Sequence, residues 1–181
     1  MIRVKYSVAL MAMAVFLCSA AVAQNAAELD KKVDEGMVKL RASSEAAKLL
    51  EKEAKGILLF PRVKKAGFIV GGQKGEGALR IGGVTKGYYK TTAASFGLQI
   101  GGQTFGYAMF FMNDGAMKYL KDKKGWEVGV GPTIVVADEG TAAALTNASG
   151  RKDIYVFFFG QKGLMAGLNV EGSKITKIDK K

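Results

Sequence analysis

The pattern of apolar and polar positions changes once along the chain, at Gly56. Before this residue, apolar side chains recur at helical spacing among charged ones, which predicts an amphipathic helix. These apolar positions are Leu29, Val33, Met37 and Leu40. Ser43 or Ser44 can cap a second helix over 45–52, and Gly56 suits the C-cap that ends it. Residues 24–55 are therefore predicted to form a helical region.

After Gly56, glycines recur among β-branched and aromatic residues, so residues 56–181 are predicted to be mainly antiparallel strands. The candidate strands are 57–60, 66–72, 76–82, 86–92, 95–103, 105–112, 127–136, 153–160, 163–170 and 174–178. Pro61 is expected to stop the first strand, because proline cannot donate a ladder hydrogen bond. The predicted fold class is α+β, with the helical region packed on a glycine-rich, strongly bent sheet or partly closed β-barrel.

Three local patterns add detail to this scheme. Residues 154–159 are apolar at every position, which predicts a strand covered on both faces, with the helical region as one cover and an exposed lipid-contacting patch as the alternative. Asn113 or Asp114 can cap a short helix, and 141–145 is a candidate for another helical turn. Ile69–Gln73 is echoed by Gln99–Gln103, 30 residues further on, as two similarly bent hairpins would require.

Residues 1–23 have the pattern of a secretory signal peptide, with a basic start, an apolar centre and a small-residue cleavage site. Lipoprotein processing at Cys18 is disfavoured, because Leu17 precedes it where a small residue is needed. Residues 24–181 are then expected to be one exported domain, periplasmic or extracellular and without a cysteine. No later apolar run reaches the roughly 20 residues of a membrane helix, so the mature chain is expected to be soluble or peripheral to a membrane.

Composition narrows the possible chemistry. The chain has 27 Lys and Arg against 16 Asp and Glu, and no histidine. Without histidine, Ser-His-Asp and Cys-His catalysis and the usual zinc ligands are excluded, and the carboxylates show no paired catalytic pattern. The glycines between 71 and 77 match no phosphate-binding loop. We therefore expect no enzyme, no cofactor and no metal site. The positive charge favours an anionic surface, which for an exported chain is lipid or envelope polymer rather than nucleic acid.

Four blocks of the sequence resemble the SYLF family of lipid-binding and actin-associated domains. The blocks are Gly56–Leu79, Ser95–Gly101, Trp126 with Gly129, and Gln161–Gly172. The resemblance implies a module that binds phosphoinositide or another acidic lipid, and actin in eukaryotic members. In eukaryotic relatives an amphipathic N-terminal helix and basic residues help lipid binding. Here these features correspond to residues 26–54 and to Arg62, Lys64 and Lys65.

An exported chain would meet neither cytosolic actin nor phosphoinositide, so the function expected from sequence is non-catalytic, peripheral binding to anionic phospholipid. The candidate headgroup contacts are Arg62, Lys64, Lys65 and Lys74. The candidate aromatic contacts at the headgroup interface are Tyr88, Tyr89 and Trp126, with packing inside the sheet as their alternative. A second hypothesis is an envelope structural or interaction protein that binds another protein. A third is sequestration of an apolar molecule within the β structure.

Overall fold

The computed structural model describes residues 26–67, 70–96, 101–122, 124–137, 152–163 and 170–180. The first element is a helix over residues 26–43, which we call the N-terminal helix. The elements that follow are α2 (Glu45–Glu51), β1 (Gly56–Gly67), β2 (Val70–Ile81), β3 (Val84–Phe96), β4 (Gly101–Phe111), α3 (Asp114–Leu120), β5 (Trp126–Glu127), β6 (Ile134–Val136), β7 (Ile154–Gly163) and β8 (Lys174–Ile178). The predicted leader, 1–23, and the candidate turn at 141–145 lie outside the described residues.

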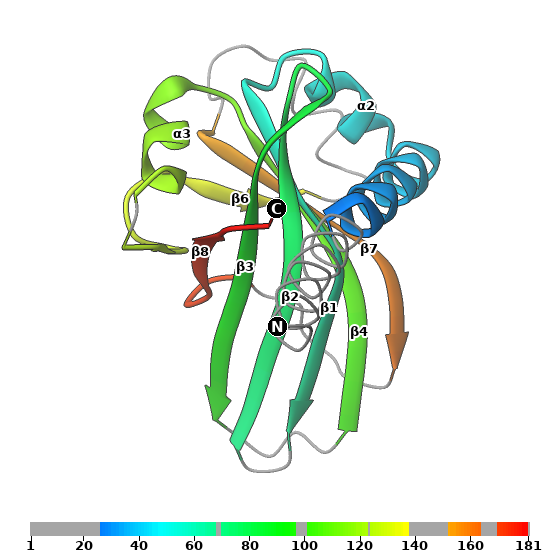
Figure 1. Cartoon of the computed structure of the whole chain (residues 1–181), viewed down its shortest axis with the longest axis vertical. Helices are drawn as coiled ribbons and strands as arrows, with labels where there is room; N and C mark the ends of the chain where they lie inside the picture. The colour runs from blue at the N-terminus through cyan, green and yellow to red at the C-terminus, as the bar shows by residue number, and fades with distance from the viewer. Residues whose placement is uncertain are drawn as a thin grey trace, which may run out of the picture.

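The eight strands form one sheet in the order β5-β8-β3-β2-β1-β4-β7-β6. The sheet is strongly curled into a half-barrel (Figure 1). Neighbouring strands are antiparallel except β6 and β7, which are parallel. The predicted α+β class is confirmed, and the bent sheet takes the form of a half-barrel.

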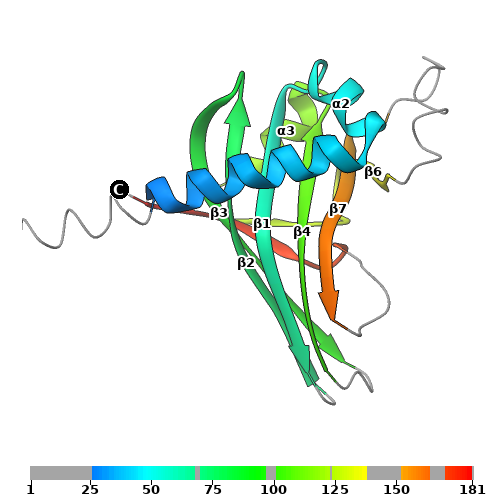
Figure 2. The ribbon, with the colours of Figure 1, turned by 90° about the vertical axis from the view of Figure 1, so that its right-hand side faces the viewer.

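The sheet separates two hydrophobic cores, one on each face. On the face that we call the helix side, the N-terminal helix and α2 cover side chains of β1, β4 and β7. On the opposite face, the α3 side, α3 and β5 cover the other side chains of the same strands. Figure 2 shows the N-terminal helix lying across the strands, with α3 behind them. The two basic regions described below are therefore separated by the thickness of the sheet.

Strand β7 confirms the prediction for 154–159. It lies between β4 and β6, and its side chains alternate between the two cores. Ile154 and Val156 are buried on the α3 side, whereas Tyr155, Phe157 and Phe159 are buried beneath the N-terminal helix. Because both faces are covered, the strand needs no polar positions.

Proline 61 does not end the first strand, and the prediction of separate strands at 57–60 and 66–72 is wrong. β1 continues through Pro61, because the register shifts between Leu59 and Arg62 on the β2 side and between Phe60 and Val63 on the β4 side. Pro61 therefore takes part in neither ladder, and its missing N–H group leaves no strand partner unsatisfied.

The helix caps are partly as predicted. Ser44 accepts a hydrogen bond from the Ala47 amide at 3.2 Å, and Asn113 caps α3 in the same way. Gly56, however, is not a C-cap. It is the first residue of β1, and a Cβ atom there would lie 3.0 Å from the sulfur of Met117. Close packing against α3, rather than a left-handed cap, favours glycine at this position.

Several other strand bounds differ from the predictions. The predicted strand at 127–136 is two short strands, β5 and β6, separated by a turn in which Gly129 and Gly131 have φ of 105° and 96°. Of the predicted strand at 95–103, residues 95–96 end β3 and residues 101–103 begin β4, and 97–100 lie outside the described residues. By contrast, β8 has the predicted bounds, 174–178.

The N-terminal helix is fixed to the sheet by polar contacts as well as by its apolar face. The Asp30 carboxylate accepts hydrogen bonds from the Thr85 and Tyr88 hydroxyls, each at 2.9 Å. Asp34 forms an ion pair with Arg80 at 2.7 Å. Burial and the hydrogen bond to Asp30 raise the pKa of Tyr88 above its usual value. Of the two predicted environments for this helix, a membrane surface or the sheet, the structure has the sheet.

Candidate anion-binding surface

Three of the predicted basic contacts lie together on the helix side of the sheet. Lys64 in β1 lies directly opposite Lys74 in β2 and Thr104 in β4. Arg62 is two residues before Lys64, so its side chain leaves the same face of β1. Arg62, Lys64 and Lys74 are all exposed. The register thus brings these three cations to one surface.

Lys65, the fourth predicted headgroup contact, lies on the opposite face. Its cross-strand neighbours are Gln73 and Gln103, and both belong to the row of side chains that contains Val63 on the α3 side. Adjacent residues of a strand point to opposite faces, so Lys64 and Lys65 cannot serve the same surface. The structure separates Lys65 from the other three candidates.

Two further lysines extend this surface beneath the N-terminal helix. Lys39 from the helix and Lys162 from β7 line a cleft of about 420 Å³ together with Arg62 and Phe159. Gly36 allows the helix to approach, because a Cβ atom at this position would lie 2.9 Å from Leu59 Cδ2. The helix-side basic surface is defined by Lys39, Arg62, Lys64, Lys74 and Lys162.

The charge of the helix-side basic surface is largely uncompensated. Within the described ranges, none of its five cations forms an ion pair. Two carboxylates lie close to this surface: Glu35 lines the cleft, and Glu76 lies directly opposite Arg62 on β2 but is paired with Lys180 at 2.7 Å. Lys64 and Lys74 are like charges placed directly across from each other, an arrangement that destabilises a sheet. A bound anion would remove this repulsion.

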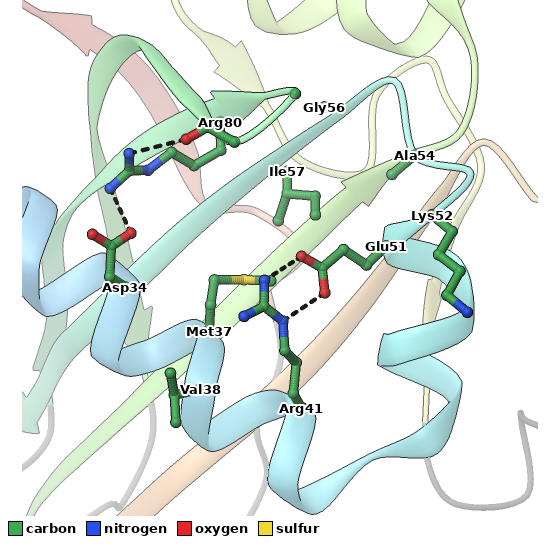
Figure 3. A pocket seen from close by; sticks show the side chains of 12 residues that line it. Asp34, Met37, Val38, Arg41, Glu51, Lys52, Ala54, Gly56, Ile57 and Arg80 are labelled. Carbon is green, nitrogen blue, oxygen red and sulfur yellow. Dashed lines mark hydrogen bonds and ion pairs between the residues drawn. The ribbon is translucent and has the colours of Figure 1, made fainter.

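A second, larger cleft lies between the N-terminal helix, α2 and the β2–β3 turn, and its volume is about 540 Å³. Its charged side chains are mostly paired, as Figure 3 shows. Arg80 pairs with Asp34, and Arg41 binds Glu51 through two nitrogens, one of them at 2.7 Å. The hydrogen bond to Glu51 raises the pKa of Arg41. These pairs hold the helix to α2 and β2, and they leave less net charge for an anion than the helix-side basic surface does.

The structure places the predicted aromatic contacts within the fold. Tyr89 and Trp126 are only 3% and 4% exposed, and the Trp126 indole N–H donates to the Val130 carbonyl at 2.9 Å. Tyr88 is half-buried and bonded to Asp30. Such positions correspond to the packing alternative rather than to a headgroup interface. The large apolar side chains that are exposed among the described residues are Val38, Leu49, Val84, Tyr119, Val130 and Val136.

Sequence reasoning missed Lys39 and Lys162. A signal existed for Lys39, because residues three or four positions apart share one face of a helix. In the N-terminal helix these positions are Lys32, Glu35, Gly36 and Lys39. All four line the same cleft. Lys162 had no such signal. Its place in the same cleft as Arg62 depends on β4 lying between β1 and β7, which is a tertiary relationship.

Other kinds of site find little support in the described part of the chain. The described residues include no group of three or more Asp, Glu, His or Cys side chains that could hold a metal ion. Among the same residues, no helix has both the length and the apolar character to cross a bilayer. On the α3 side, the concave face is filled by packed rings such as Phe60 and Tyr107, whose centroids are 4.8 Å apart.

Comparison with known proteins relates the second half of the chain to a protein family. Residues 92–181 match a family model, Ysc84, which is described as Las17-binding protein actin regulator. The match begins within β3 and extends through β8, so it includes Lys162 and excludes Arg62, Lys64 and Lys74. None of the curated proteins matches the chain.

Proposed function

Because the chain belongs, through residues 92–181, to the Ysc84 (SYLF) family, we propose that it is a non-catalytic module that binds anionic phospholipid peripherally through the helix-side basic surface. The Ysc84/SYLF family is a family of binding domains associated with actin and lipid. To this family-level association we add a ligand class, anionic phospholipid, and a binding surface, the helix-side basic surface. It also includes export, as the signal-peptide pattern of residues 1–23 suggests.

The observation that carries the proposal is the pair Lys64 and Lys74. These two lysines lie across from each other on neighbouring strands, with Arg62 and Lys162 close by. None of these four cations forms an ion pair within the described ranges, and Glu76, which lies opposite Arg62, is paired with Lys180. A protein that used these lysines only for solubility would not need to place like charges in register. A surface of phosphate groups offers each of them a counter-charge.

The experiment that tests the proposal is vesicle flotation. The chain from Gln24 onward should float with vesicles that contain phosphatidylglycerol, should not float with phosphatidylcholine vesicles, and should be released by high salt. Replacing Arg62, Lys64 and Lys74 by glutamine should weaken the free energy of vesicle binding by about 1 kcal/mol per residue at low salt. Together the three changes should lower partitioning onto the vesicles by about 100-fold.

A matched control keeps this test specific. Replacing Lys31, Lys52 and Lys86 by glutamine removes the same charge from exposed lysines outside the helix-side basic surface. If the two triple variants lose flotation equally, net charge rather than this surface explains binding. If the folded wild-type chain does not float with either kind of vesicle, the proposal is wrong.

A second candidate function is binding of another envelope protein, and the edge of the sheet favours it. β6 pairs with β7 and with no other described strand, and Val136 at its end is 49% exposed. Edge strands of this kind can accept an extended segment of a partner. A charge-neutralised variant that no longer floats but still binds its partner would favour this function.

A further inference from the structure

A second basic surface lies on the α3 side of the sheet. Lys118, Tyr119, Lys121 and Asp122, at the C-terminal end of α3, line a hollow of about 480 Å³. Lys124 lies just before β5, and Val130 lies just after it. The α3-side surface is defined by Lys118, Tyr119, Lys121, Lys124 and Val130. Tyr119 is 46% exposed and Val130 is 60% exposed, so apolar groups and ammonium groups are presented together.

The α3-side surface is held in place by short-range contacts. The Tyr119 ring packs on Gly131, where a Cβ atom would lie 2.4 Å from Tyr119 Cε1. The Trp126 indole fixes the turn by donating to the Val130 carbonyl. The Lys124 amide donates to Asp122 Oδ1 at 3.0 Å. Tyr119 in α3 and Val130 in the turn after β5 are therefore exposed at defined positions, because buried neighbours fix their backbone.

The α3-side surface and the helix-side basic surface are on opposite sides of one sheet. Ala116, Met117 and Leu120 attach α3 to the α3-side core, whereas the N-terminal helix packs on the other core. The views in Figures 1 and 2 agree with this separation. One flat membrane cannot lie against both faces of the sheet.

We propose that the α3-side surface is a second contact for anionic phospholipid headgroups, so that one molecule tethers two acidic membrane surfaces. The inference rests on the proposed function, because the first contact is the helix-side basic surface. The lysines of the α3-side surface complement the negative charge of the headgroup phosphates. Tyr119 matches the boundary between headgroups and acyl chains, where a side chain with one apolar and one wet side is favoured, and the exposed Val130 side chain adds an apolar contact beside it.

The test is clustering of vesicles, measured by dynamic light scattering next to flotation. The chain from Gln24 onward should cluster phosphatidylglycerol vesicles, and high salt should disperse them. Replacing Lys118, Lys121 and Lys124 by glutamine should leave flotation unchanged, because the helix-side basic surface supports it. The same variant should raise the protein concentration needed for half-maximal clustering by about 100-fold. The variant with Lys31, Lys52 and Lys86 replaced by glutamine is the control and should cluster vesicles like the wild type.

The outcomes separate this inference from the proposed function. Wild-type chain that floats without clustering overturns the tether but keeps peripheral binding. Clustering that survives replacement of the three α3-side lysines also overturns the tether, and points to self-association or to a protein-binding role for α3. Absence of flotation overturns the proposed function itself. Clustering lost in the Val130→Ser variant, which removes an exposed apolar group without changing charge, would support the interfacial contact independently.

Discussion

Gln73 and Gln103 lie at the same register on the two sides of Lys65, one in β2 and the other in β4. The two glycines that precede each glutamine pair with Ala66 and Gly67 in the same symmetrical way. The sequence echo at 69–73 and 99–103 therefore marks two neighbours of a single strand, β1. The two glutamine side chains meet the same face of the sheet, and both are buried.

The buried amides lead to a prediction about stability. Gln103 Oε1 is buried and has no hydrogen-bond partner among the residues that the structure describes, which costs free energy. Gln103→Met should therefore raise the free energy of unfolding by about 1 kcal/mol in urea denaturation. Gln161→Met, at an exposed position, should change it little. A clear loss of stability in Gln103→Met would mean that the amide has a partner in solution.

Gly77 should be far less replaceable than Gly72, although both are in β2. A Cβ atom at Gly77 would lie 2.2 Å from the Leu59 carbonyl oxygen and 2.7 Å from the Phe60 ring, beside the bulge at Pro61. At Gly72 the nearest atom would be 3.9 Å away. Thermal unfolding should show a loss of about 3 kcal/mol or more for Gly77→Ala and a small change for Gly72→Ala. Equal effects would contradict the packing described for the bulge.

Asp153 should contribute stability that depends on pH. Its carboxylate accepts hydrogen bonds from the Thr133 amide and hydroxyl, each at 2.8 Å, and from the Asn113 amide at 2.7 Å. These bonds hold the pKa of Asp153 below its usual value. The contribution is therefore present above the unfolded pKa of about 4 and is lost as the pH falls through the lowered folded pKa.

The variant that tests this is Asp153→Asn. At pH 7 it should be less stable than the wild type by about 1 to 2 kcal/mol, because a charged acceptor of three hydrogen bonds is replaced. The difference should shrink in urea titrations at successively lower pH below about 4. A difference that grows in acid would have the wrong sign for a carboxylate whose pKa is lowered by folding.

The hydroxyl of Tyr88 should help to hold the N-terminal helix on the sheet. Tyr88→Phe removes the hydrogen bond to Asp30 while Thr85 and Arg80 remain, so a loss of about 1 kcal/mol is expected. Amide exchange in the helix should become faster. Tyr119→Phe is the matched control, because no hydrogen bond of its hydroxyl occurs within the described residues. Identical effects of the two changes would argue against this attachment.

Features that depend on neighbours in sequence were predictable here. Helical spacing gave the N-terminal helix, the Ser44 and Asn113 side chains marked two helix starts, and the apolar run at 154–159 marked a strand buried on both faces. Each of these signals acts within a few residues, so no knowledge of the fold was needed.

Features that depend on strand pairing were not predictable. Sequence predicts a strand end at Pro61, because the bulge that accommodates this residue is visible only in the pairing of β1 with β2 and β4. The basic surface was found in part, since Arg62, Lys64 and Lys74 share a face, but Lys162 joins them only through the fold. Lys65 could have been excluded by alternation alone, because it is adjacent to Lys64.

The strand order also dictates when the molecule can be completed. β1, β2 and β3 can pair in sequence as soon as they exist, and β4 joins β1. β3, however, waits for β8, which is made from almost the last residues of the chain and pairs over Tyr88 to Thr92. Pairings between such distant segments form slowly. A chain that is still being synthesised therefore cannot complete its sheet. A fragment that begins at residue 92 would lack β1 and β2, the two strands that lie between β3 and β4.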